Sequence, residues 1–169
     1  MKNLKDYIME SSNQPDLLKR AKEIDEPFVK AALENEGWKV TKGTLDNDFK
    51  GIDLKVEKTD DESEFGGKYN IDVKRNSPKN KNSKNFLLTV VSDKGDEFEW
   101  KNTDCFAFID DENQNIVLAK HDDVKAFADK YKKYDSEYDN SKYVLLPKRE
   151  IYKLGRTIEP SEDIKSMLQ

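Results

Sequence analysis

Apolar residues recur at helical spacing in the first part of the chain. Between Asp25 and Glu36 they form a stripe that predicts a helix, with Asp25 as its N-cap and Gly37 as its C-terminal stop. A shorter helix is expected to begin at Pro15, because proline is favoured in a first helical turn. Further helices are expected over 121–134 and 148–154.

Runs rich in β-branched and aromatic residues predict strands over 38–41, 51–58, 68–75, 86–91, 105–109, 116–119 and 143–146. A charged turn that ends in Gly66-Gly67 joins the second and third runs, which predicts a hairpin. Strands interspersed with helices predict an α/β fold with a central mixed β-sheet flanked by helices. We expect a polar N-terminal leader over 1–14 and a single domain over 15–169.

Three charged residues stand out in the predicted hairpin. Asp53 lies in its first arm, and Asp72 and Lys74 lie two residues apart in its second arm. Side chains alternate between the faces of a strand, so Asp72 and Lys74 project to the same side, and pairing of the arms brings Asp53 close to both. Two carboxylates and an amine on one face suit a hard cation such as Mg²⁺ and a phosphate.

Composition narrows the class of protein. The 169 residues suffice to bury a core, 38% of them are charged, and no apolar run approaches the roughly 20 residues that span a bilayer. The N-terminus lacks the apolar core of a signal peptide. A single cysteine, Cys105, excludes an internal disulfide and fits a reducing cytoplasm, and its place in a buried strand predicts an inert thiol. Any metal would be held by oxygen.

Residues 26–74 resemble the core of the PD-(D/E)XK, or restriction-endonuclease-like, nuclease superfamily. The motif layout is closest to that of archaeal Holliday junction resolvases: a helix that starts with glutamate and ends in Gly-aromatic, a strand, and a hairpin with Asp on one arm and Asp-x-Lys on the other. The resemblance implies that Asp53, Asp72 and Glu26 hold Mg²⁺ or Mn²⁺. It also implies that Lys74 orients the attacking water and stabilises the transition state, in a DNA endonuclease.

The motif leaves some assignments open. Ile52 stands where relatives usually have the proline before the first aspartate. Asp48 is an alternative first ligand, although Asp53 is favoured because apolar neighbours place it in a strand. Glu23 or Glu34 takes the role of Glu26 if the helix has a different phase.

A basic loop follows the predicted site. Arg75, Lys79, Lys81 and Lys84 lie there without an acidic residue between them, and they are expected to bind a DNA backbone by counterion release. The alternative is a solvated loop. The resemblance favours a homodimer, because many relatives cut two strands with two sites. Small size and a Lys-, Asn- and Asp-rich composition favour a phage or mobile-element gene.

The net charge of −5 supports a rival function. DNA-binding proteins usually carry a basic face, whereas an acidic protein can imitate DNA and occupy the channel of a host replication or defence protein, for example a sliding clamp. Such a protein has no catalysis. The acidic runs are Asp60 to Glu64, Asp93 to Glu99, Asp110 to Glu112 and Asp135 to Asp139. A nuclease needs its carboxylates to converge, whereas a mimic needs an ordered acidic surface.

Overall fold

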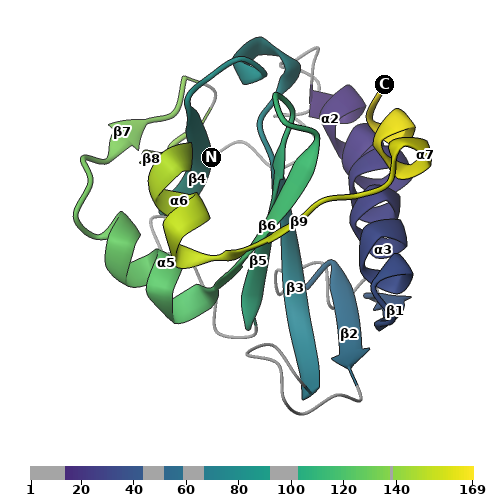
Figure 1. The fold of residues 1–169 in the computed structure, drawn as a ribbon. Coiled ribbons are helices and arrows are strands. Elements are labelled where there is room, and N and C mark those ends of the chain that lie inside the picture. The colour runs from purple at the N-terminus through teal and green to yellow at the C-terminus, as the bar shows by residue number, and fades with distance from the viewer. Residues whose placement is uncertain (1–13, 44–51, 59–66, 92–102, 138) are drawn as a thin grey trace.

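A computed structural model describes residues 14–43, 52–58, 67–91, 103–137 and 139–169 (Figure 1). The leader expected over residues 1–14 lies outside these ranges except for Gln14. None of the helices within the described ranges is long and apolar enough to cross a membrane.

A mixed six-stranded sheet forms the centre of the molecule, as the sequence predicted. Its strands in spatial order are β1 (Lys39–Lys42), β2 (Leu54–Lys58), β3 (Gly67–Arg75), β5 (Cys105–Asp110), β6 (Asn115–Lys120) and β9 (Arg156–Ile158). β2 pairs antiparallel with β1 on one side and with β3 on the other, and the β2–β3 pairing confirms the predicted hairpin. β5 runs parallel to β3, and β6 and β9 continue the sheet antiparallel. The carboxyl ends of β3 and β5 therefore meet at one edge.

One face of this sheet is covered by the N-terminal helices and the C-terminal segment (Figure 1). These elements are α2 (Gln14–Arg20), a π-helical turn (Ala21–Asp25), α3 (Glu26–Asn35), α7 (Glu162–Lys165) and a 3-10 turn (Ser166–Leu168). The prediction that Asp25 is an N-cap is wrong, because the helix runs through it and its side chain makes no capping hydrogen bond. Gly37 follows the helix with a φ of 92°, a conformation that glycine adopts without strain.

The opposite face carries α5 (His121–Ala128), α6 (Lys148–Leu154) and a second sheet (Figure 1). This smaller sheet has the order β4 (Asn85–Val91), β8 (Lys142–Pro147) and β7 (Tyr134–Asp135), and a 3-10 turn (Pro78–Asn80) precedes it. The helix expected over 121–134 ends earlier, at Ala128, and the chain then forms β7. The predicted strands 86–91 and 143–146 pair with each other instead of joining the central sheet.

Strand alternation sorts the core into two apolar clusters. On β5, Ala107 and Ile109 pack with the α3 side, whereas Phe106 and Phe108 pack with β4, β8 and the helices beside them. The rings of Phe108 and Phe86 stack with their centroids 4.9 Å apart, which fastens the second sheet to the first.

The same alternation places the charged residues of β3. Ile71 is buried on the α3 side and Val73 packs there too, so Asp72 and Lys74 project to the opposite face. In the register they lie beside Phe106 and Phe108 of β5. The predicted pair therefore lies on the face that the second sheet partly covers.

Candidate metal and phosphate site on β2 and β3

Asp53 is fixed against β3 on both sides of Asp72. Its backbone N–H donates to the carbonyl of Ile71 at 3.0 Å, and its carboxylate Oδ2 accepts from the backbone N–H of Val73 at 2.8 Å. Antiparallel pairing of the hairpin arms produces this arrangement, because Leu54 is the register partner of Ile71. The predicted convergence of the two aspartates is therefore present, and their carboxyl groups are hydrogen-bonded to each other.

Lys74 completes the group of three. Its Nζ lies 3.1 Å from Asp72 Oδ2, and its side chain is 27% exposed while that of Asp72 is 5% exposed. Asp53 is partly exposed as well. The site therefore has one buried carboxyl group, from Asp72, beside two groups that are partly exposed to solvent, the carboxyl of Asp53 and the ammonium of Lys74.

Burial dominates the electrostatics of Asp72. Loss of hydration raises the pKa of its carboxyl to about 7, the positive charge of Lys74 opposes the rise, and the neighbouring Asp53 adds to it. Two carboxyl groups in contact resist double ionisation, so the metal-free pair holds a proton close to neutral pH. Perturbed carboxyl groups of this kind occur at functional sites more often than elsewhere.

The donor atoms fit a hard divalent cation. Within the described residues Asp72 Oδ2 is closed off from solvent and accepts no well-aligned hydrogen bond, although Lys74 Nζ lies close by. Buried oxygen atoms of this kind are usually satisfied by a donor or an ion. Oxygen donors from Asp53 and Asp72 are the ligand type that Mg²⁺ and Mn²⁺ prefer. Among the described residues no third His, Cys, Asp or Glu side chain joins these two carboxyl groups in a cluster that could hold a metal.

Glu26 is not grouped with the two aspartates. It is buried at the start of α3, and its carboxylate lies 3.2 Å from Nζ of Lys22. Its alternatives, Glu23 and Glu34, are exposed on the helix surface, and Glu34 pairs with Lys30 at 2.6 Å. Asp48, the alternative first ligand, lies outside the described residues.

Arg75 points away from the predicted DNA-binding loop and into the protein. Its guanidinium contacts Asp25 at 2.7 Å and Asp111 at 2.6 Å, and its side chain is 7% exposed. Arg20 also approaches Asp25, at 3.4 Å. Burial raises the pKa of Asp25, and the two arginines act against that rise. This network joins the helical layer to the carboxyl ends of β3 and β5, so Arg75 has a structural role that the sequence did not predict.

Sequence reasoning missed this network because its members are far apart in the chain. Asp25 is 50 residues from Arg75, and Asp111 is 36 residues away. One signal was available: Asp110-Asp111 directly follows a buried strand, and a parallel partner strand ends at the same edge of the sheet. Recognition of the parallel pairing would have placed Asp111 beside the end of β3.

The remaining basic loop is held in one conformation by Asn76. Its buried side-chain amide donates to the carbonyl of Asn85 at 2.8 Å and accepts from the N–H of Leu87 at 3.0 Å. Of the cations expected to bind DNA, Lys79, Lys81 and Lys84 are exposed. They project from an anchored loop that begins two residues after Lys74.

Comparison of the chain with family models, with curated proteins and with solved structures gave no match. The chemistry of the site is therefore inferred from its geometry. Two adjacent carboxyl groups can hold a divalent cation, and the nearby ammonium group of Lys74 can neutralise charge on a phosphate or orient a water molecule.

Proposed function

We propose that this protein is a metal-dependent phosphodiesterase that cuts DNA, an endonuclease of the restriction-endonuclease-like fold. The observation that carries the proposal is the convergence of Asp53, Asp72 and Lys74 on one face of the sheet, with Lys74 Nζ 3.1 Å from Asp72. An Asp-x-Lys pair on a strand is by itself usually an ion pair. The pair of Asp72 and Lys74 differs from an ordinary ion pair in two ways: a second carboxyl group, that of Asp53, lies beside it, and the pKa of Asp72 is raised.

The order of the elements supports the proposal. A helix that begins with Glu26 precedes β1, and the antiparallel strands β2 and β3 follow as the arms of the hairpin. The buried strand Cys105–Asp110 then lies beside β3. This is the layout that the resemblance to the nuclease superfamily implies.

Each residue of the site has a distinct part in the proposed reaction. Asp53 and Asp72 would hold Mg²⁺ or Mn²⁺, which supplies Lewis acidity and a lowered pKa for bound water. Lys74 would place its ammonium group against a phosphate oxygen and orient the attacking water. Because Asp72 keeps its proton up to about pH 7, loading with metal is expected to release that proton and to strengthen as the pH rises.

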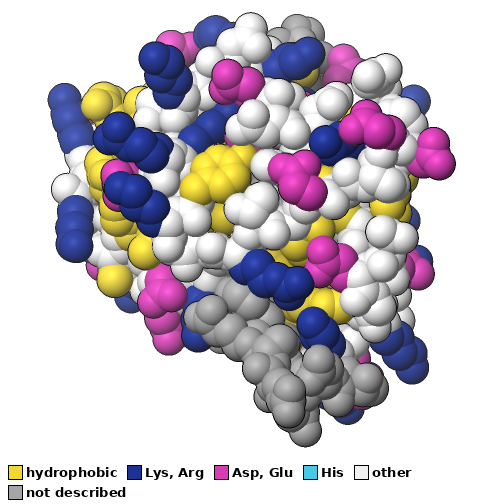
Figure 2. All heavy atoms as spheres, viewed as in Figure 1, with side chains coloured by type: hydrophobic (Ala, Val, Ile, Leu, Met, Phe, Trp, Pro, Cys, Tyr) yellow, Lys and Arg dark blue, Asp and Glu magenta, His cyan; other side chains and the backbone are white. Residues whose placement is uncertain are grey.

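The rival function, imitation of DNA by acidic surface, has less support. Asp110 and Asp111 are paired inside the protein, with Lys148 at 2.9 Å and with Arg75 at 2.6 Å. In the last acidic run Asp135 pairs with a lysine of β8 at 2.6 Å. The runs at 60–64 and 93–99 lie outside the described residues. In Figure 2 lysine and arginine side chains gather on the side of the molecule that β7, β8 and α6 form, which suits contact with a nucleic acid.

The test is cleavage of supercoiled, linear and branched DNA by the purified protein, with Mg²⁺ or Mn²⁺ and with EDTA. We expect metal-dependent cleavage that falls by at least about 100-fold in Asp72→Asn and in Lys74→Met, because each removes a group that acts on the transition state. Asp123→Asn, an exposed aspartate on α5, serves as the matched control and is expected to cleave like the wild type.

Absence of cleavage with every metal and substrate would contradict the proposal. Equal cleavage by the wild type and Asp72→Asn would also contradict it, because the activity would then come from another site or from a contaminant. If the protein neither cuts nor binds DNA, capture of a host DNA-processing protein on the immobilised chain becomes the test of the rival function.

A further inference from the structure

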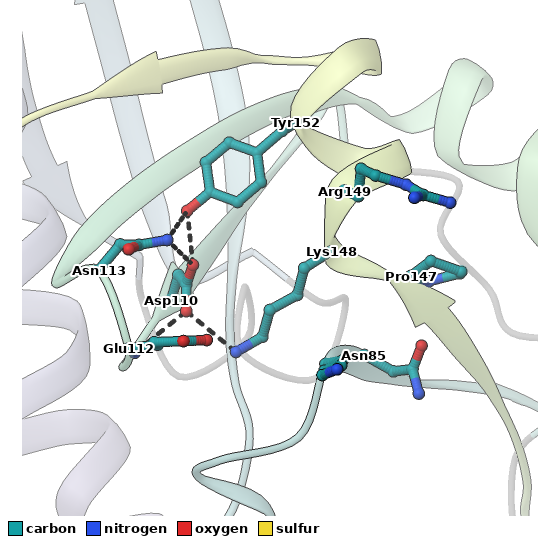
Figure 3. Close-up of a pocket in the computed structure, with 9 residues that line it drawn as sticks. Asn85, Asp110, Glu112, Asn113, Pro147, Lys148, Arg149 and Tyr152 are labelled. Carbon is teal, nitrogen blue, oxygen red and sulfur yellow. Dashed lines mark hydrogen bonds and ion pairs between the residues drawn. The ribbon is translucent and has the colours of Figure 1, made fainter.

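A pocket of about 470 Å³ opens between α6, the end of β8 and the turn after β5 (Figure 3). Its walls come from segments that are distant in sequence: Lys84 and Asn85 at the start of β4, Glu112 and Asn113 after β5, and Lys148 and Arg149 at the start of α6. Binding pockets for small ligands have volumes of roughly 300 to 1,000 Å³. This pocket is therefore large enough for a nucleobase with its sugar and phosphate.

The floor of the pocket is formed by Asp110 and the side chains that are hydrogen-bonded to it (Figure 3). Asp110, 1% exposed, accepts hydrogen bonds from Nζ of Lys148 at 2.9 Å, from the hydroxyl of Tyr152 at 2.5 Å and from the amide of Asn113 at 2.9 Å. Burial alone raises the pKa of Asp110, but the hydrogen bonds from Tyr152 and Lys148 outweigh it and hold that pKa below its usual value. The charge of Lys148 is thus balanced by Asp110.

The mouth of the pocket is basic. Lys84 is exposed, and the side chain of Arg149 is 83% exposed, with its Nε 3.6 Å from the carboxylate of Glu150. The backbone N–H of Lys148 donates to the carbonyl of Lys84 at 3.0 Å, which ties the basic loop to the start of α6. Lys81 and Lys79, whose Nζ lies 3.8 Å from Glu137, are exposed farther along the same loop, and Glu112 is the single exposed acid among the lining residues. An anionic ligand is favoured at this mouth.

The pocket lies on the face of the central sheet that carries the site. Asp110 continues the row of Phe106 and Phe108, the strand positions beside Asp72 and Lys74. Asp110 is one residue beyond Ile109, the register partner of the last residue of β3. At about 3.3 Å per residue the pocket floor is roughly 13 Å along the strand direction from Asp72, about four nucleotide rises of DNA.

We propose that this pocket binds one nucleotide of a DNA strand, with Lys84 and Arg149 on its phosphate and the amide of Asn85 facing its base. Side-chain amides suit this role because they donate and accept hydrogen bonds at base edges. The assignment rests on the proposed nuclease function and adds a substrate contact about four nucleotides from the scissile phosphate.

Fluorescence anisotropy with labelled single-stranded and duplex oligonucleotides in EDTA measures binding without cleavage. We expect the double variant Lys84→Ala/Arg149→Ala to bind at least about tenfold more weakly. The slope of log K against log salt concentration should become shallower by about one unit, because the two side chains share one phosphate. Glu112→Gln is expected to bind about two- to threefold more tightly, because it removes a like charge from the wall. Lys19→Ala/Lys39→Ala, at two exposed lysines outside the pocket, is the charge-matched control and should bind as the wild type does.

Competition identifies the ligand. Deoxyadenosine monophosphate is expected to displace the oligonucleotide at about a tenfold lower concentration than inorganic phosphate, and equal competition would overturn the assignment of a nucleotide. Unchanged DNA affinity and salt dependence in Lys84→Ala/Arg149→Ala would overturn the proposal that the pocket binds a nucleotide. Cleavage that depends on Asp72 would in that case still support the proposed nuclease activity. If the wild type binds DNA through the pocket but never cuts it, the proposed nuclease activity is contradicted, whereas nucleotide binding by the pocket is supported.

Discussion

Replacement of Asp72 by asparagine is expected to change stability in a pH-dependent way that follows from the burial of this carboxyl. The folded protein keeps the Asp72 proton up to about pH 7, whereas the unfolded chain releases it near the usual pKa of 3.8. Between these values the folded state binds more protons, so the free energy of unfolding falls as the pH rises. The contribution of the Asp72 proton to the free energy of unfolding is therefore largest below pH 3.8, and it is lost as the pH rises through about 7.

The size of the effect follows from the two pKa values. At about 1.4 kcal/mol for each tenfold change in proton affinity, a pKa that moves from 3.8 to about 7 destabilises the metal-free protein by about 4 kcal/mol at pH 8. At pH 5 the same relation gives about 2 kcal/mol. Asp72→Asn keeps the shape of the side chain and cannot ionise. Its stability relative to the wild type should therefore increase by about 2–3 kcal/mol between pH 5 and pH 8.

Urea unfolding in EDTA at a series of pH values, followed by tryptophan fluorescence, measures this difference. Other titrating groups are common to both proteins and cancel in the comparison. The exposed control Asp123→Asn is expected to show a difference from the wild type that does not change with pH. A pH-independent difference for Asp72→Asn would refute the reasoning, because the carboxyl would then ionise equally in both states.

Two further variants test the ion-pair network of Arg75 and the hydrogen bonds of Asn76, which lie next to the site. Arg75→Met leaves the carboxylates of Asp25 and Asp111 buried without their shared partner, so urea unfolding should show a loss of about 3–5 kcal/mol; a loss below about 1 kcal/mol would contradict the structural role of Arg75. Asn76→Ala removes the hydrogen bonds that anchor the basic loop and should cost about 1–3 kcal/mol. It should also speed hydrogen exchange over 76–87, and unchanged exchange there would contradict the anchoring.

Local patterns were sufficient to predict the part of the fold that carries the site. Apolar, β-branched runs over 51–58 and 68–75, joined by a charged turn, predicted the hairpin, and the hairpin alone brings Asp53 to Asp72 because its arms pair antiparallel. The amphipathic stripe after Asp25 predicted α3. Both the hairpin and this helix could be predicted because they depend on contacts between residues that are close in sequence. Burial of Cys105 was also predicted correctly, and burial raises the pKa of its thiol to about 12.

The errors arose where distant residues meet. Aspartate is a preferred N-cap residue, but the carboxylate of Asp25 pairs with Arg20 and Arg75, and the helical backbone continues through Asp25. The strand Asn85–Val91 pairs with Lys142–Pro147, a contact that spans more than fifty residues and that no local pattern specifies. The pocket above Asp110 depends on this pairing, so it could not be predicted from the sequence.

Metal binding measured without substrate is the most direct test of the central claim that Asp53 and Asp72 hold a divalent cation beside Lys74. Calorimetric titration of the wild type with Mn²⁺ at pH 8 is expected to show a site that weakens at pH 6, where Asp72 keeps its proton. Asp72→Asn should lose this site and Asp123→Asn should retain it. Equal Mn²⁺ binding by the wild type and Asp72→Asn, or no binding by the wild type, would contradict the claim.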